Sequence, residues 1–120
     1  MKRSTAPVAA AVLTVLFTAA GPAAARDVGC RIEQQGKVVL DRTCDFQADG
    51  RDGSFVLSAR GRQGDLLPGI SLVTVSVISP GLAEVRGLTR DGINSRWGEA
   101  HRSARDGACW DGSDFRICAR

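Results

Sequence analysis

Apolar and polar residues alternate with a period of two in several short segments of the chain. Residues 54–59 place Phe55, Leu57 and Ala59 on one side, and residues 71–78 place three valines on one side. This alternation is typical of half-buried β-strands. We therefore predict a strand at each segment, and we expect residues 71–78, the most apolar of them, to form the central strand.

Turn-forming residues separate these segments at short intervals, and most of them pair Gly with Asp or Pro. They fall at Gly36, Ala48-Asp49-Gly50, Asp52-Gly53, Pro68-Gly69, Pro80-Gly81, Asp91-Gly92, Asp106-Gly107 and Asp111-Gly112. Residues 60–69 are the one longer loop, and we expect Leu66 and Leu67 to pack against the core. No stretch after residue 25 has a convincing helical period. The pattern therefore predicts an all-β fold, a small antiparallel barrel or sandwich of about seven to eight strands.

The Asp91-Gly92 pair is the strongest hairpin signal, because both central positions of a type I′ turn need a positive φ. Taking these two residues as the loop sets a register for the flanking strands. It pairs Thr89 with Asn94, Leu88 with Ser95, Gly87 with Arg96, Arg86 with Trp97, Val85 with Gly98, and Glu84 with Glu99. One face then carries small residues that pack onto the core. The other face has more varied chemistry and carries Glu84, Arg86, Ser95, Trp97, Glu99 and His101.

Residues 1–25 have the three zones of a secretory signal peptide. Lys2 and Arg3 are positive, residues 8–20 are an apolar run broken only by two threonines, and small residues lead up to Ala25. As a helix, the apolar run would span about 20 Å, which is short of the roughly 30 Å hydrocarbon core. We therefore expect cleavage near Ala25 and no stable membrane anchor.

The mature chain is then a single disulfide-stapled β domain of residues 26–120, periplasmic or secreted. A lipid attachment signal before Cys30 would need apolar or small residues where Arg26 and Asp27 stand. Loss of the leader removes two of the 16 Lys and Arg residues and none of the 13 acidic ones, so the net charge falls from +3 to +1. This charge does not favour a nucleic-acid partner.

All four cysteines lie in the mature chain, an even number that favours two disulfides in an oxidising compartment. Turn signals between the members of each pair favour the local pairing Cys30–Cys44 and Cys109–Cys118. If residues 113 and 114 form the second loop, Cys109 lies directly opposite Cys118. The spacings contain no Cys-x-x-Cys and the chain has a single histidine, so we expect neither a metal site nor a cofactor.

Two sets of residues on the varied face of the hairpin could take part in catalysis or in ligand binding. Glu84 and Glu99 would lie opposite each other with His101 adjacent, an arrangement suited to acid–base chemistry. Arg86 and an exposed Trp97 would suit the recognition of a sugar or a protein, since Trp and Arg are enriched in binding hot spots. Trp97 has a structural alternative, in which it caps the sheet. The carboxylates have a structural alternative, because Arg86 could neutralise Glu99 diagonally or a bulge could shift the register.

The second tryptophan of the mature chain follows Cys109 directly. Trp110 is expected to pack over the neighbouring disulfide as part of the structure rather than to bind a ligand.

The layout of the mature chain resembles a group of small, exported, uncharacterised proteobacterial proteins. The resemblance rests on Cys30…Cys44, Gly53-Ser54-Phe55, Arg105-Asp106-Gly107-Ala108-Cys109-Trp110 and Arg116-Ile117-Cys118-Ala119, and it implies a β-rich secreted architecture. The chain is also similar in architecture to periplasmic lysozyme inhibitors, which are small disulfide-stapled barrels. Their inhibitory loop resembles Ser-Gly-x-x-Tyr, and this chain has no tyrosine, so no inhibitory residue is transferred.

These observations favour a non-enzymatic envelope module, inhibitor-like or otherwise, that binds a protein or glycan through Arg86, Trp97, Glu99 and His101. The alternatives are a small hydrolase that uses Glu84, Glu99 and His101, and a purely structural envelope component. About 95 residues can build one small β core but leave little loop length for a water-excluding catalytic pocket. The size of the chain therefore places the binding module first.

Overall fold

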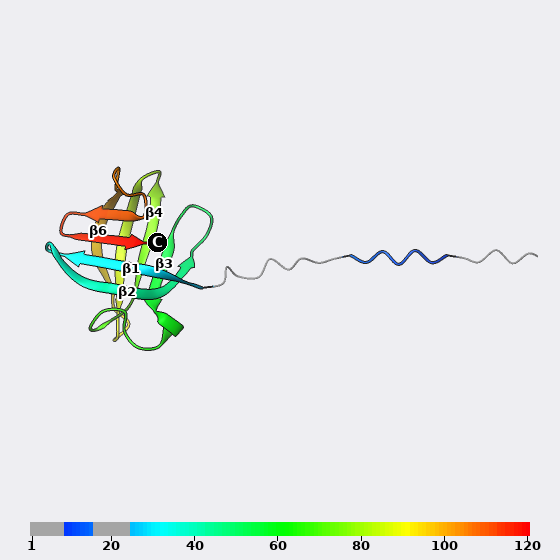
Figure 1. The fold of residues 1–120 in the computed structure, drawn as a ribbon, viewed down its shortest axis with the longest axis horizontal. Helices are drawn as coiled ribbons and strands as arrows, with labels where there is room; N and C mark the ends of the chain where they lie inside the picture. Colours follow the sequence, from blue (N-terminus) through cyan, green and yellow to red (C-terminus); the bar gives the residue numbers. More distant parts are fainter. Residues whose placement is uncertain (1–8, 16–24) are drawn as a thin grey trace, which may run out of the picture.

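The computed structural model describes residues 9–15 and 25–120, and most of the second range forms one β-barrel (Figure 1). The predicted signal peptide lies largely outside the described residues. The strands are β1 (Arg26–Gln34), β2 (Lys37–Ala48), β3 (Phe55–Ala59), β4 (Ile70–Ser79), β5 (Leu82–Thr89), β6 (Asn94–Arg102), β7 (Cys109–Gly112) and β8 (Phe115–Ala119), with one 3-10 turn, η1 (Arg60–Arg62). In the described part of the chain, no helix has the length and apolar character needed to cross a membrane.

The eight strands follow chain order around a closed barrel, and each is antiparallel to its neighbours. Pairing of β1 with β8 closes the sheet, from Cys30 opposite Ala119 to Gln34 opposite Phe115. The all-β prediction is confirmed. Of the two predicted architectures, barrel and sandwich, the structure has the barrel. A closed barrel has no central strand, but β4 pairs along both sides, with β3 and with β5.

The core fills the barrel with the apolar residues that the period-two pattern points inward. Phe55, Leu57 and Ala59 of β3 are all buried, and so are Val73 and Val75 of β4. Burial of these side chains stabilises the fold by about 25 cal/mol for each Å² of apolar surface removed from water.

The long loop after β3 also contributes to the core, as its sequence predicts. Leu66 and Leu67 are only 2% and 5% exposed and belong to the core cluster. The Arg42 side chain on β2 donates hydrogen bonds to the Asp65 and Leu66 carbonyls at 3.0 and 3.1 Å. The loop is therefore held against the barrel by both apolar and polar contacts.

Both disulfides have the predicted local pairing. Cys30–Cys44 joins β1 to β2 inside the core cluster, and Cys109–Cys118 joins β7 to β8. The turn between β7 and β8 consists of residues 113 and 114, and Cys109 lies directly opposite Cys118 as expected. Trp110 is 2% exposed and belongs to the core, in agreement with a structural role.

The β5–β6 hairpin departs from its predicted register toward the tip. Its loop has three residues, because the Thr89 amide donates to the Ile93 carbonyl at 2.8 Å and the Gly92 amide donates to the Thr89 carbonyl at 3.0 Å. Gly92 has a φ of 81°, which suits a three-residue loop closed by a left-handed glycine. The extra loop residue moves the tip pairs by one position, so that Arg86 lies opposite Arg96.

A β-bulge returns the hairpin to the predicted register below the tip. Glu84 pairs with Glu99 and Val85 with Gly98, as predicted, and the shift falls between Val85 and Arg86. The bulge leaves Trp97 without a partner opposite it. An inserted residue of this kind changes the face on which the neighbouring side chains lie.

The Trp97 side chain consequently lies on the inner side of the sheet. It is partly buried against the core, and its ring centroid is 5.7 Å from that of Phe115 in an edge-to-face arrangement. The indole also covers Gly87, where an added Cβ would lie 2.9 Å from the indole nitrogen. The prediction that Trp97 shares an outer face with Arg86, Glu99 and His101 is therefore wrong, and Arg96 takes its place there.

Candidate functional site

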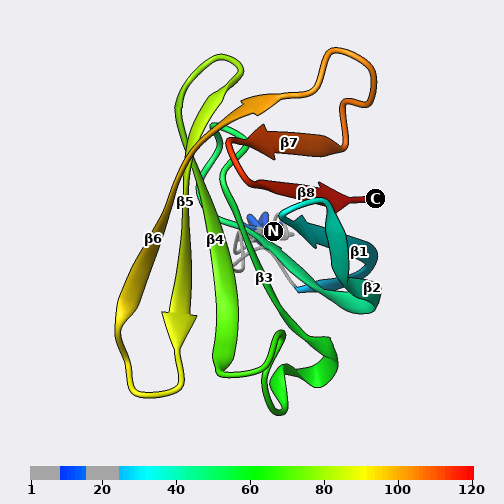
Figure 2. The same cartoon turned by 90° about the vertical axis from the view of Figure 1, so that its left-hand side faces the viewer.

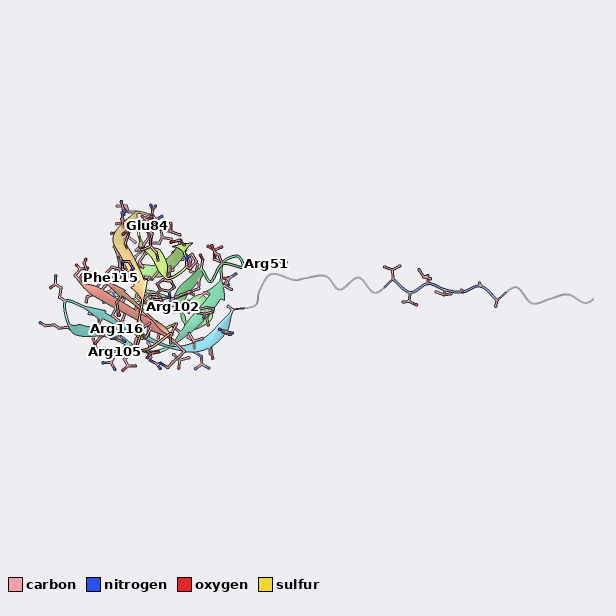
Figure 3. The ribbon with its side chains drawn as sticks, turned by 90° about the horizontal axis from the view of Figure 1, so that it is seen from above. Arg51, Glu84, Arg102, Arg105, Phe115 and Arg116 are labelled. Carbon is pink, nitrogen blue, oxygen red and sulfur yellow. A yellow bond between two sulfur atoms is a disulfide. The ribbon has the colours of Figure 1, made fainter. Side chains whose placement is uncertain are left out.

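The outer face of the β5–β6 hairpin is a small network of ion pairs. The Glu84 carboxylate accepts from Arg86 at 3.0 Å and from the Nε of Arg96 at 3.1 Å. Glu99 lies directly opposite Glu84 and is exposed. Arg86 thus neutralises Glu84 rather than Glu99, and the two arginines relieve the repulsion between the facing carboxylates. Figure 3 shows Glu84 at the outer edge of the barrel, away from Phe115.

His101 lies on the same strand as Glu99, two positions further along. It is exposed and pairs in register with Leu82 on β5 and with Asp111 on β7. Sequence reasoning thus placed Glu84, Glu99 and His101 on adjoining strands correctly. They share an open convex surface, and in the described residues no cluster of three or more His, Cys, Asp or Glu side chains is suited to hold a metal ion.

A groove of about 480 Å³ lies beside β6, at the end of the barrel where the β1–β2 and β7–β8 turns meet. We call it the turn-end groove. Trp97 of β6 and Phe115 of β8 form its aromatic floor. Its full lining is Gln34, Gln35, Lys37, Val39, Arg96, Trp97, Asp114 and Phe115.

Tight turns hold the walls of the turn-end groove in place. Gln35 and Gly36 have φ values of 52° and 74°, so they form the two-residue loop of the β1–β2 hairpin with the twist that antiparallel strands favour. The Gln35 amide donates to the Asp114 carbonyl at 2.7 Å. This bond ties the β1–β2 turn to the β7–β8 turn and fixes one wall of the groove.

The charges around the turn-end groove are predominantly positive. Lys37 and Arg96 line it, and Asp114 is the only acidic side chain among its lining residues. Lys37 takes part in none of the ion pairs found in residues 9–15 and 25–120. Its ammonium group is therefore available to a ligand, whereas the Arg96 guanidinium is oriented by Glu84.

A second groove, of about 490 Å³, lies at the opposite end of the barrel. Val77, Ile78 and Pro80 contribute to it, and the Arg102 guanidinium lies 4.8 Å from the Trp110 ring centroid. Trp110 is almost completely buried. The cation therefore covers the aromatic ring and leaves little of it for a ligand, in contrast to the half-buried Trp97.

Sequence reasoning found one member of the turn-end groove, Trp97, and missed the others. Lys37, Asp114 and Phe115 belong to hairpins other than the one that carries Trp97. Only barrel closure brings these three hairpins together. One local signal was present, since the glycine at position 87 leaves room for a large side chain above it.

The chain matches no protein-family model, no curated protein and no solved structure.

Proposed function

We propose that this chain is an exported, non-enzymatic module that binds a protein or glycan of the cell envelope at the turn-end groove. One observation carries the proposal: a groove whose walls are joined by a backbone hydrogen bond between two turns combines a floor of half-buried Trp97 and buried Phe115 with the cationic side chains Lys37 and Arg96. Binding sites typically join an apolar, aromatic base to a few well-placed polar groups.

The hydrolase alternative draws less support from the geometry. A catalytic carboxyl usually lies in a cleft that excludes water and perturbs its protonation. Glu84 is instead neutralised by two arginines, and Glu99 and His101 are exposed on a convex face. None of these three residues lines the turn-end groove.

Export is the second part of the proposal. The apolar residues Val12 and Leu13 are 84% and 85% exposed, so they take no part in the barrel core. The first strand begins at Arg26, directly after the expected cleavage position. Two disulfides are compatible with an oxidising compartment.

Binding to an envelope extract tests the proposal through three variants of residues 26–120. Trp97→Ala removes half of the aromatic floor, and we expect a hot-spot loss of at least thirtyfold in affinity for the recovered ligand. Because Trp97 is partly buried, we also expect the free energy of unfolding to fall by about 2 kcal/mol. Lys37 is exposed, so Lys37→Glu should weaken binding of an anionic ligand without this loss of stability.

Arg51→Glu is the matched control, because it makes the same charge reversal in the loop at the other end of β2 (Figure 3). It should retain full binding. Equal binding by the Trp97→Ala, Lys37→Glu, Arg51→Glu and unmodified domains, measured by biolayer interferometry, would remove the turn-end groove as the site.

A further inference from the structure

The strand β6 has an unpaired edge beside the turn-end groove. On its β7 side it pairs only from Ala100 to Arg102, opposite Gly112 to Trp110. Beyond Gly112 the chain turns into β8, which pairs with β1 instead. Within the described structure, residues 94–96, 98 and 99 therefore have a ladder partner on the β5 side alone, and Figure 2 shows β6 extending past the short strand β7.

The hairpin geometry identifies the backbone groups that this edge presents. Hydrogen-bonded and non-hydrogen-bonded pairs alternate along an antiparallel ladder. The Thr89 amide donates to the Ile93 carbonyl, so Thr89–Ile93 is a hydrogen-bonded pair. Leu88–Asn94 and Arg86–Arg96 are then non-hydrogen-bonded pairs, with Gly87–Ser95 between them. The amides and carbonyls of Asn94 and Arg96 consequently point away from β5, toward the open side.

The side chains next to this edge fit one kind of guest strand. Arg96 lies on the outer face and Trp97 on the inner side, next to Phe115. A strand placed along the edge alternates its side chains between the same two sides. Apolar residues on one side of the guest would therefore meet the aromatic floor, and acidic residues on the other side would meet Arg96, while Lys37 adds a second positive charge to the groove.

We propose that the edge of β6 from Asn94 to Trp97 receives an extended acidic peptide segment of a partner protein, which adds to the barrel as a strand. This inference rests on the proposed function and narrows its ligand from protein or glycan to a peptide strand. Main-chain hydrogen bonds to Asn94 and Arg96 supply the pairing, and side-chain contacts in the groove supply selectivity. The bulge after Arg96 limits the added ladder to this short stretch.

The probe is the acetylated and amidated hexapeptide of three Val-Glu repeats, added to isotopically labelled residues 26–120. We expect saturable binding and slowed hydrogen exchange at the Asn94 and Arg96 amides, with no change at Ser95, whose amide already faces β5. The Val-Lys hexapeptide keeps the alternation and reverses the charge, so it should bind at least tenfold more weakly. In an extended peptide the Val amides point to one edge and the Glu amides to the other, and only one edge pairs with β6. N-methylation of the amides on the pairing edge should therefore abolish binding, and N-methylation of the other set should leave binding unchanged.

Arg96→Pro and Arg96→Ala separate the backbone from the side chain. Both remove the guanidinium, but only proline removes the amide at position 96. That amide is not part of the β5 ladder, so proline is tolerated there as it is on other strand edges. We expect Arg96→Pro to bind the Val-Glu peptide at least tenfold more weakly than Arg96→Ala, with melting temperatures of the two variants within a few degrees.

Three results would overturn strand addition. The first is equal peptide affinity of folded Arg96→Pro and Arg96→Ala, or no peptide binding at all. The second is a concentration-dependent dimer in analytical ultracentrifugation that Arg96→Pro abolishes, which assigns the edge to a second copy. The third is a glycan ligand whose binding leaves exchange at Asn94 and Arg96 unchanged. If Trp97→Ala or Lys37→Glu still weakens binding of an envelope ligand in any of these cases, the proposed function stands without the strand.

Discussion

The contact between Trp97 and Gly87 decides how the turn-end groove is formed. The indole lies over the one position of β5 that has no side chain to obstruct it, and it reaches Phe115 on the far side of the opening. A residue as small as alanine at position 87 would place its Cβ 2.9 Å from the indole nitrogen. The glycine is thus needed for close packing and not for an unusual backbone conformation.

Gly87→Ala should therefore displace the indole and destabilise the barrel. Overpacking of this kind costs about 1–3 kcal/mol, and we expect a lower urea midpoint together with a red shift of tryptophan emission as Trp97 becomes more exposed. Gly29→Ala is the control, since its Cβ would meet the Arg120 carbonyl at an ordinary 3.6 Å. Indistinguishable midpoints for the two variants would contradict the packing role of Gly87.

At the scale of the elements, the sequence predicts strands more reliably than the register within a hairpin. The alternation in β3 and β4 is enough to identify their inward residues, and two turn residues are enough to pair Cys109 with Cys118. In β5–β6 the type of turn was misread. A three-residue loop and a bulge offset each other, so the register is correct at Glu84 and wrong at Trp97. The period-two alternation of the sequence does not reveal two inserted residues whose effects on the register cancel.

An ion pair holds the loop between β3 and β4 against the β5–β6 turn. Arg90 in the β5–β6 turn forms an ion pair with Asp65, whose carboxylate also accepts from the Gly69 amide at 3.1 Å. The hydrogen bond from Arg90, aided by the Gly69 amide, holds the pKa of Asp65 below its usual 3.8 despite partial desolvation. Since the folded-state pKa is the lower one, Asp65 stabilises the fold above about pH 4, and this contribution disappears as the pH falls through the lowered pKa.

Asp65→Asn should consequently be less stable than the unmodified domain at pH 7, and the two should become equally stable well below pH 3.8. Urea unfolding at a series of pH values measures the difference. Arg90→Ala removes the main cause of the lowered pKa, so it should flatten the same part of the profile. A constant stability gap between the Asp65→Asn variant and the parent from pH 7 to pH 2 would argue against the pairing.

At the scale of the whole molecule, disulfides supplement a core that is limited by chain length. Cys30–Cys44 and Cys109–Cys118 are separated by 14 and 9 positions, and loop entropy assigns them stabilisation of about 3 and 2.7 kcal/mol. The bridges lie on either side of the β1–β8 seam, and neither of them crosses it. The disulfide pairing was predictable because each bridge joins two strands of one hairpin. The turn-end groove was not, because it exists only once the seam has closed.

The proposed export predicts that the protein is cleaved directly before Arg26. The barrel needs β1 from Arg26 onward, since Arg26 pairs with Phe46 and places its guanidinium 4.7 Å from that ring. N-terminal sequencing of protein recovered from the producing cell should therefore begin at Arg26. A chain that begins at an acylated Cys30 would lack the first four residues of β1, and either that form or one that retains Met1 would refute the signal-peptide interpretation.

Closure of the barrel also brings Gly29 near the start of β1 and Arg120 after β8 together, far from the turn-end groove. Gly29 and Arg120 exchange backbone hydrogen bonds of 2.7 and 3.1 Å, whereas Gln34 and Phe115, at the other end of the same seam, line the groove. Five residues of strand separate the two places by about 16 Å. A surface tether at either terminus therefore leaves the groove facing outward. A short linker from Arg120 to Arg26 would likewise permit circular permutation, with the new ends opened in a loop remote from Trp97.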